Sequence, residues 1–243
     1  MKIAAIITTL WLTGASAAAL AQDANTLLAS MDNVIFGPKD KQGNVKIILS
    51  DDRSGSGRIR EAIMMQKGTD KKLYRYTKPE KQAGIATLSL PGDIMWLYMP
   101  AFGKPTKISF LFKSGAFNGT DFSYEDMATT PYADRFDPEL LESNDKAYVL
   151  QLIPRLGKSQ YSKILVSIDK ENYYPKVMEY FDRGGQKFKE AKYTYQKIGK
   201  YWNASEVVMV DLRKEHSTRI QLTDIKLDQG LDDELFRVEN LAQ

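Results

Sequence analysis

The sequence predicts a mainly β (α+β) protein, in which a curved antiparallel sheet of about 11–12 strands forms a half-barrel covered by a few short helices. Many short segments alternate apolar with charged residues, which is typical of strands with one wet face. The turns between them are rich in Gly, Asp, Ser and Pro, and they are too short to hold crossover helices. Neighbouring strands are therefore expected to be antiparallel, and a sheet this wide tends to curl.

The N-terminus has the pattern of a signal peptide. Lys2 precedes an apolar stretch, residues 3–12, that is too short to span a bilayer, and small residues lead to Ala19-Leu20-Ala21. We expect cleavage after Ala21, which makes residues 1–21 the signal peptide and residues 22–243 a single half-barrel domain in the periplasm. The chain contains no cysteine, so a hydrophobic core has to stabilise the domain.

One helix and six strands are expected in the first half of the mature chain. Apolar residues recur on one face of a helix over residues 23–36, and Gly37-Pro38 ends it. The six strands are expected at residues 45–49, 58–65, 72–76, 85–90, 94–99 and 107–112.

The run from Ile94 to Met99 is apolar on both faces, although most strands around it alternate. A strand of this kind requires a cover on its second face. The sequence leaves open whether that cover is a helix, a bound ligand, or a neighbouring segment or tail of the chain.

Residues 114–144 interrupt the strands and are expected to form a helical insertion that serves as a lid or plug. The Ser-x-x-Asp pattern from Ser123 to Asp126 predicts one helix start, and Asp137-Pro138 predicts a second with Pro in its first turn. Six further strands are then expected at residues 148–153, 163–168, 176–181, 187–195, 205–212 and 218–227, followed by a helical turn at residues 232–236.

No catalytic constellation is recognisable, so we expect no enzyme, no cofactor and no metal. His216 is the only histidine and is expected to be an exposed loop residue. Asp121 and Asp126 are expected to cap a helix, whereas Glu179 and Glu190 are expected on paired strands among lysines. The net charge of +3 is spread along the chain and predicts no nucleic-acid partner.

Several segments resemble one protein family. They are Lys72-Leu73-Tyr74-Arg75-Tyr76, Gly84-Ile85-Ala86-Thr87-Leu88, Met95-Trp96-Leu97-Tyr98-Met99-Pro100, and above all Phe117-Asn118-Gly119-Thr120-Asp121-Phe122-Ser123-Tyr124-Glu125-Asp126. The last block is similar to a "GSDFSYED"-like signature of the outer-membrane lipoprotein-sorting protein family, with Thr120 in place of the usual Ser. The resemblance covers nearly the whole mature chain.

The resemblance implies the fold of the LolA and LolB periplasmic carriers, with a hydrophobic cavity that shelters acyl chains and with no catalytic or metal site. Large apolar and adaptable thioether side chains would line such a cavity. The candidates for this lining are Trp96, Tyr98, Phe110, Phe112, Met178 and Tyr180. Gly119, Thr120, Asp121 and Asp126 are expected to be structural, forming a turn and the caps of the lid.

The expected function is therefore transport to the outer membrane of a lipid or lipoprotein whose acyl chains lie in the cavity. The main alternative is a non-catalytic accessory subunit of an envelope transporter, with helices that fill the sheet permanently. An inner-membrane transporter is a further expected partner. An enzyme acting on an envelope lipid or glycan is the third hypothesis, and it has no support in the sequence.

Overall fold

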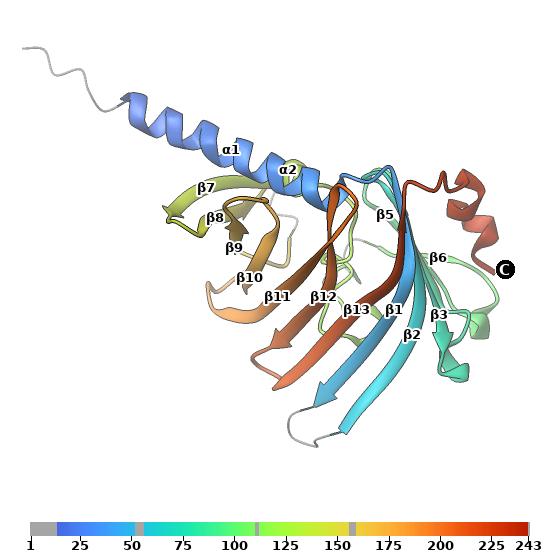
Figure 1. Cartoon of the computed structure of the whole chain (residues 1–243). Coiled ribbons are helices and arrows are strands. Elements are labelled where there is room, and N and C mark those ends of the chain that lie inside the picture. Colours follow the sequence, from blue (N-terminus) through green and yellow to red (C-terminus); the bar gives the residue numbers. More distant parts are fainter. Residues whose placement is uncertain (1–13, 52–55, 110–111, 156–158, 243) are drawn as a thin grey trace, which may run out of the picture.

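A single curled antiparallel sheet of 13 strands dominates the chain (Figure 1). The computed structural model describes residues 14–51, 56–109, 112–155 and 159–242. The strand order is β6-β5-β4-β3-β2-β1-β13-β12-β11-β10-β9-β8-β7, so the sheet stays open and ends at β6 and β7. The expected curved antiparallel sheet is confirmed, with 13 strands where about 11–12 were expected.

Most helices and strands lie where the sequence predicts them. The strands are β1 (Asp40–Asp51), β2 (Ser56–Lys67), β3 (Lys71–Lys78), β4 (Ala86–Leu90), β5 (Ile94–Tyr98), β6 (Thr106–Lys107), β7 (Phe136–Ser143), β8 (Ala147–Pro154), β9 (Lys163–Asp169), β10 (Pro175–Phe181), β11 (Lys187–Ile198), β12 (Tyr201–Asp211) and β13 (His216–Leu227). The helices are α1 (Gly14–Phe36) and α2 (Tyr132–Arg135), with short 3₁₀ turns at Glu80–Gln82, Pro100–Phe102, Phe117–Gly119, Asp233–Phe236 and Val238–Ala242.

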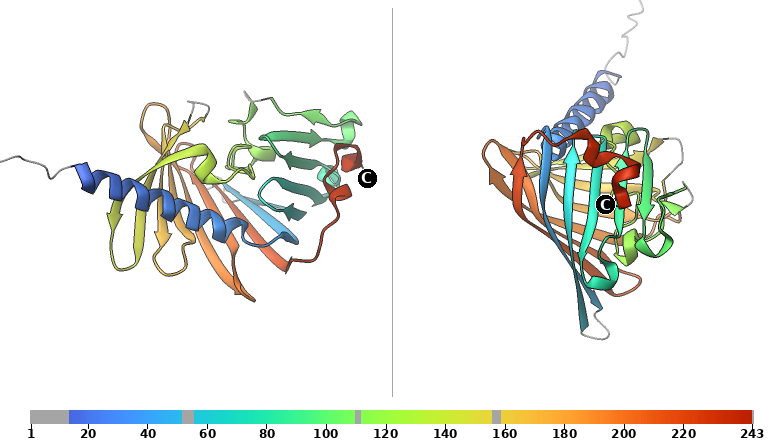
Figure 2. Two further views of the ribbon diagram at one scale, coloured as in Figure 1. Left: turned by 90° about the horizontal axis from the view of Figure 1, so that it is seen from above. Right: turned by 90° about the vertical axis from the view of Figure 1, so that its right-hand side faces the viewer.

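The main core lies on the concave side of the sheet. Helix α1 runs along the rim of the curl and packs on β7 and β12 (Figures 1 and 2). Its Leu28 and Met31 are fully buried among side chains from the strands, such as Ile47 and Val166. The expected helix at residues 23–36 is confirmed, and it extends back to Gly14. No helix in the described ranges is long and apolar enough to cross a membrane.

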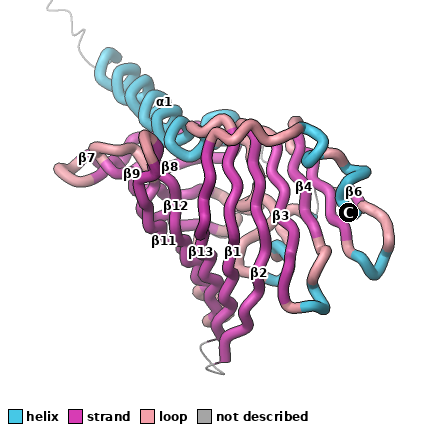
Figure 3. The backbone as a smooth tube through the Cα atoms, turned by 45° about the vertical axis from the view of Figure 1, so that its right-hand side comes forward, coloured by secondary structure: helices cyan, strands magenta, loops and turns pink. Residues whose placement is uncertain are grey.

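A second, smaller cluster lies on the outer face of β3, β4 and β5. The C-terminal segment, residues 229–242, folds back over these strands (Figure 3) and buries Phe236 and Leu241 against Leu88 and Tyr98. The guanidinium of Arg75 donates to the Leu241 carbonyl at 3.0 Å. The second apolar face of β5 is therefore covered by the tail of the chain, whose expected helical turn is present as Asp233–Phe236.

The expected second helix of the insertion is wrong, because residues 136–143 form strand β7. Its Pro138 lies opposite Leu152 of β8. Since β7 is an edge strand, it has no outer neighbour that needs the N–H that proline lacks. The Asp-Pro-Glu pattern that resembles a helix start is here compatible with the edge of a sheet.

Two other expectations for this region need correction. Strand β6 covers only Thr106–Lys107, where residues 107–112 were expected. The Ser-x-x-Asp pattern closes a turn and not a helix: the Ser123 amide donates to the Asp126 carboxylate at 2.7 Å, and the Asp126 amide donates to the Ser123 hydroxyl at 3.1 Å. The remainder of the lid, residues 112–135, consists of turns, one 3₁₀ turn and the four-residue α2.

Phe236 tests how much the C-terminal segment contributes to stability. Phe236→Ala removes a ring that is 3% exposed and leaves a cavity over β4, so we expect the free energy of unfolding to fall by about 3–5 kcal/mol in urea titrations. Leu235→Ala is the matched control, since the Leu235 side chain is 37% exposed. Equal, small effects for both variants would contradict the packing role of this segment.

Candidate functional site

A cleft of about 850 Å³ lies between the two free ends of the sheet. One wall is the β4–β5 turn with β6, the other is β7 with the end of β8, and the lid lies between them. The lining residues are Gly92, Asp93, Ile94, Lys107, Ile108, Ser109, Lys113, Ser114, Glu125, Ala128, Thr130, Asp134, Arg135, Phe136, Pro154, Arg155, Ser159, Gln160 and Arg183. The volume is within the usual range of small-molecule pockets.

Glu125 ties the lid to the loop before β9. Its carboxylate accepts hydrogen bonds from the Ser159 hydroxyl and, at 3.1 Å, from the Gln160 amide. Burial raises the pKa of Glu125, although these two hydrogen bonds act in the opposite direction. The lid is therefore held at the floor of the cleft by a carboxylate that the protein largely encloses.

Helix α1 fixes the position of Arg135 through α2. The Asp32 carboxylate accepts hydrogen bonds from the amides of Tyr132 and Ala133 at 2.9 and 2.8 Å, at the start of α2. The Arg135 guanidinium then lies 4.7 Å from the centre of the Tyr132 ring and 5.2 Å from that of Phe136. Its Nε is buried, and no described residue forms a hydrogen bond with it.

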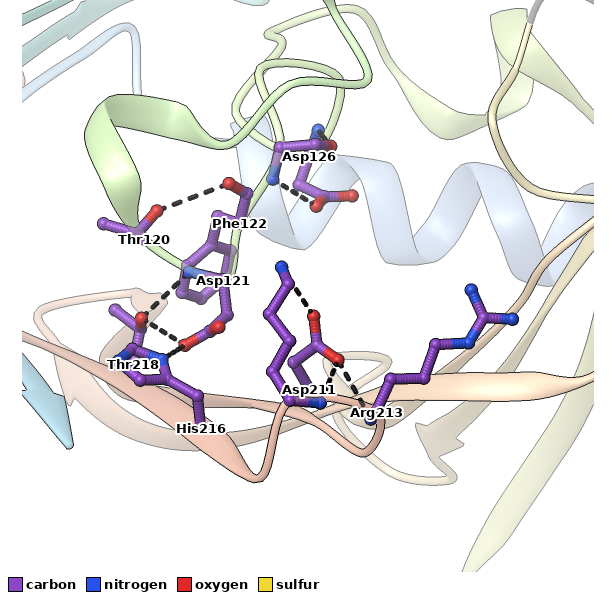
Figure 4. Close-up of polar contacts among 10 residues, drawn as sticks. Thr120, Asp121, Phe122, Asp126, Asp211, Arg213, His216 and Thr218 are labelled. Atoms are coloured by element: carbon purple, nitrogen blue, oxygen red, sulfur yellow. Dashed lines mark hydrogen bonds and ion pairs between the residues drawn. The ribbon is translucent and has the colours of Figure 1, made fainter. Parts of the chain in front are cut away.

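A second contact fastens the lid to β13 (Figure 4). The Asp121 carboxylate is 2.6 Å from the Thr218 hydroxyl and 2.7 Å from Nδ1 of His216, and the Asp121 amide is 3.0 Å from the same hydroxyl. The prediction that His216 is an exposed loop residue is wrong, because its side chain is 18% exposed and begins β13 against the lid. Asp121 likewise caps no helix.

The rest of the signature block forms a compact turn. Gly119 has a φ of 74°, in the left-handed region that favours glycine. The Thr120 hydroxyl donates to the Phe117 carbonyl at 2.8 Å, and an Arg60 guanidinium donates to the Asn118 carbonyl. Asp126 also accepts a hydrogen bond of 2.7 Å from the Tyr161 hydroxyl. These contacts give the lid a defined shape on the concave face.

The candidate lining residues lie in three different places. Met178 and Tyr180 are buried in the main core, where the hydroxyls of Tyr132, Tyr180 and Tyr193 lie 3.5–3.6 Å from the Met178 sulfur. Burial raises the pKa of Tyr180 and Tyr193 well above its ordinary value. These two candidates are thus on the concave side of the sheet.

The other four candidates do not share that wall. Trp96 and Tyr98 belong to the outer cluster under the C-terminal segment. Phe112 is 72% exposed, and Phe110 is outside the described residues. The structure therefore does not bring the six candidates together, and their role as ligand contacts stays a prediction.

A polar row crosses the concave face near the cleft, and we call it the lysine row. Lys41 of β1 is opposite Gln66 of β2, Gln66 is opposite Lys72 of β3, and Lys72 is opposite Ser89 of β4. Lys72 shares its face with Tyr74, which packs on the main core, whereas Leu73 points to the outer cluster. Neither lysine has an ion pair or a hydrogen bond to a carboxylate within the described ranges.

Both lysines are strongly desolvated. Burial lowers the pKa of Lys41 to about 8. Burial, with the nearby positive charges of Lys41 and Arg135, lowers the pKa of Lys72 to about 7. Each residue is half-buried, so part of its surface remains accessible.

Comparisons with known proteins agree with this architecture. A family model described as "Uncharacterized protein" matches residues 68–243. A domain described as an outer membrane lipoprotein-sorting protein domain, from Vibrio parahaemolyticus, is 27% identical with a TM-score of 0.83, covering 92% of this chain and 100% of that one. The chain belongs to the family that this model describes, and its fold is LolA-like. The search of curated proteins returned no match.

Two more solved structures show the same LolA-like fold. A DUF1329 family protein from Desulfovibrio piger has a TM-score of 0.85 at 23% identity and covers 91% of this chain and 99% of its own. A LolA superfamily protein from Nitrosomonas europaea has a TM-score of 0.75 at 24% identity, and the match covers 88% of this chain and 97% of that one.

Among the described residues, no group of His, Cys, Asp and Glu could hold a metal ion.

The sequence reasoning missed Lys41, Lys72 and Arg135. The sequence does contain a signal for Lys72, because it lies two and four residues before Tyr74 and Tyr76 and must therefore share their face of β3. Arg135 could not be found in this way, since its position depends on the contact between α1 and α2.

Asp121→Ala tests the contact between the lid and β13. It leaves the buried Thr218 hydroxyl without its acceptor, so we expect the free energy of unfolding to fall by about 1–3 kcal/mol. Asp145→Ala, at an exposed position, is the control in the same urea titrations. Adding Thr218→Val to Asp121→Ala should cost less than the sum of the two single changes. Full additivity would contradict the coupling.

The low pKa of Lys72 predicts a pH-dependent stability. A lysine in the unfolded chain has a pKa of about 10.4, so between about pH 7 and pH 10 the folded chain binds fewer protons and gains stability as pH rises. Below about pH 7 both states are protonated and the penalty is complete. The melting temperature of the wild type, relative to Lys72→Gln, should therefore increase over this range.

Lys46→Gln controls for the loss of a charge, since Lys46 is exposed on the opposite face of β1. Its melting temperature should stay parallel to that of the wild type over the same pH range. Parallel curves for Lys72→Gln as well would show that Lys72 is not desolvated.

Proposed function

We propose that this protein is a periplasmic carrier that shelters the acyl chains of a lipid or lipoprotein on the way to the outer membrane. The observation that carries the proposal is the cleft of about 850 Å³ between the free ends of an open, curled sheet. The lipoprotein-sorting description of the Vibrio parahaemolyticus relative supports it. No catalytic step belongs to this function.

The energetics require a concave site of this kind. Hiding an acyl chain from water is worth about 0.8 kcal/mol for each buried CH₂, which is roughly 10 kcal/mol for a chain of about sixteen carbons. A flat surface buries too little of a chain to supply this. An apolar concavity beside an opening between two sheet edges can enclose it, and the lid can cover the part that remains in contact with water.

The packing of α1 is consistent with removal of the signal peptide. We propose cleavage after Ala21, as the sequence predicts. The buried apolar side chains of α1 that the structure describes are Ala24, Leu27, Leu28 and Met31, all downstream of that point. Cleavage there would leave the packed part of the helix, residues 22–36, in the mature protein.

One observation favours a second candidate function, an accessory subunit of an inner-membrane transporter. Leu28, Met31 and the lid residue Phe117 fill part of the concave face with the protein's own side chains. A permanently filled sheet would present its surface to a partner and bind no lipid. The two functions therefore differ in whether the concavity accepts a ligand.

Lipid extraction and dye displacement distinguish the two functions. Protein purified from its host should release lipid detectable by mass spectrometry, and the delipidated protein should bind a hydrophobic dye with saturation. Ala128→Trp places an indole in the cleft and should weaken dye binding by about tenfold or more, whereas Ala101→Trp at an exposed site should not.

Two results together would contradict the carrier function. If no lipid is released, and if neither the wild type nor the control variant binds the dye, the carrier function is wrong. Co-purification of a transporter with ligand-free protein would then support the accessory function.

A further inference from the structure

We propose that the lysine row and Arg135 form a recognition site for the anionic headgroup of an amphiphile that enters through the cleft. This inference rests on the proposed carrier function and adds to it the class of ligand. The site recognises a phosphate-type group attached to an alkyl or acyl chain, and the concavity takes the chain.

The first argument is that the two lysines lack a counter-ion. Lys41 and Lys72 flank Gln66 across three adjacent strands, on the face that carries the main core. Within the parts of the chain that the structure describes, no carboxylate pairs with either. Cations on a concave protein face without an internal partner are costly to keep charged, and an external anion would offset that cost.

The second argument is that unpaired donors line the adjoining cleft. Nε of Arg135 and Nε2 of Gln160 are both buried, and neither has a hydrogen-bond partner among the residues that the structure describes. Both residues line the cleft, and Arg135 is close enough to Lys72 for its charge to act on that ammonium. Buried polar groups are normally satisfied, so two open donors in one cleft indicate a ligand that accepts hydrogen bonds.

Continuity between the row and the cleft is the third argument. Lys72 is opposite Ser89, Ser89 is opposite Met95, and the next residue, Ile94, lines the cleft. The Thr87 hydroxyl lies on the same face of β4 as Ser89, is 1% exposed and has no hydrogen-bond partner among the described residues. Arg135, which lines the cleft and whose charge acts on Lys72, is the group that joins the cleft to the row.

The charge of the cleft agrees with an anionic ligand. Five of its lining residues are Lys or Arg, and three are Asp or Glu. Of these, Lys113 is already paired with Asp93 and Arg155 with Asp137, whereas the charged end of Arg135 makes one hydrogen bond within the described ranges, of 3.4 Å to the Glu125 carbonyl. Arg and Lys together favour phosphate over a neutral hydroxyl headgroup, since charge-assisted hydrogen bonds are roughly twice as strong as neutral ones.

Matched amphiphiles test the proposal directly. Delipidated full-length protein is titrated at neutral pH with hexadecyl phosphate and with hexadecanol, which share one chain and differ in the headgroup, and binding is followed by displacement of a hydrophobic dye. The wild type should bind hexadecyl phosphate about tenfold tighter or more. Lys41→Gln with Lys72→Gln should lose most of that preference and keep its affinity for hexadecanol.

Lys46→Gln with Lys104→Gln removes the same charge from exposed positions and should keep the full preference. Unchanged hexadecanol binding in the double Lys41/Lys72 variant shows that it is folded. Equal binding of both amphiphiles by the wild type would overturn the headgroup site and leave the carrier function intact. Binding of neither would contradict the carrier function itself.

Competition with inorganic phosphate distinguishes a site for an amphiphile headgroup from a site for free phosphate. Inorganic phosphate should displace hexadecyl phosphate only at concentrations more than about a hundredfold higher, because it lacks the chain that buries apolar surface. If it binds the wild type as tightly as hexadecyl phosphate does, the site is one for free phosphate and the amphiphile assignment is wrong.

Discussion

The open sheet is the constraint on which the rest of the structure depends. Thirteen antiparallel strands curl without closing, so β6 and β7 are the two edge strands of the sheet. An edge strand presents backbone N–H and C=O groups that have no neighbouring strand to pair with. A closed barrel would need no cover, but an open one has to blunt both edges. Here β6 is only two residues long, β7 carries a proline and a bulge, and the lid with α2 occupies the space between them. The cleft is what this covering leaves open.

The concave face is unusual because it combines a dense apolar core with charge. Around α1 the strands contribute fully buried side chains such as Ile47 and Leu150, which is the arrangement of an ordinary core. Toward β3 and β4 the same face carries two lysines, a glutamine and two buried hydroxyl residues. Burying polar groups in this way costs stability unless something pairs with them. The division of one face into an apolar part and a cationic part matches the two parts of an amphiphile.

Much of this fold follows from the sequence, because strand periodicity and short turns are local signals. Every strand except β7 corresponds to a segment that the sequence predicts as a strand. Strand β6 is shorter than expected. The failures have non-local causes. Pro138 resembles a helix start until it is known that β7 has no outer neighbour. His216 looks like a loop residue until Asp121, 95 positions earlier, is brought within 2.7 Å. Trp96 and Tyr98 lie under the C-terminal tail, a position that local periodicity could not indicate, and their role as ligand contacts stays a prediction.

The contacts of the lid determine what a ligand in the cleft would have to displace. The lid is fastened at two ends, by Asp121 on β13 and by Glu125 on the loop before β9, while Asp32 of α1 positions the start of α2. Each of these contacts depends on a carboxylate that the protein has largely desolvated. An apolar interface holds the lid as well, because its Phe117, Phe122 and Met127 side chains are buried in the main core. Displacing the lid would therefore expose buried apolar side chains in addition to breaking hydrogen bonds, and each large side chain is worth about 1.5–3 kcal/mol. In the proposed carrier, an acyl chain thus enters the space that the lid leaves open, and the sheet beneath it, whose inner strands are paired on both sides, does not need to move.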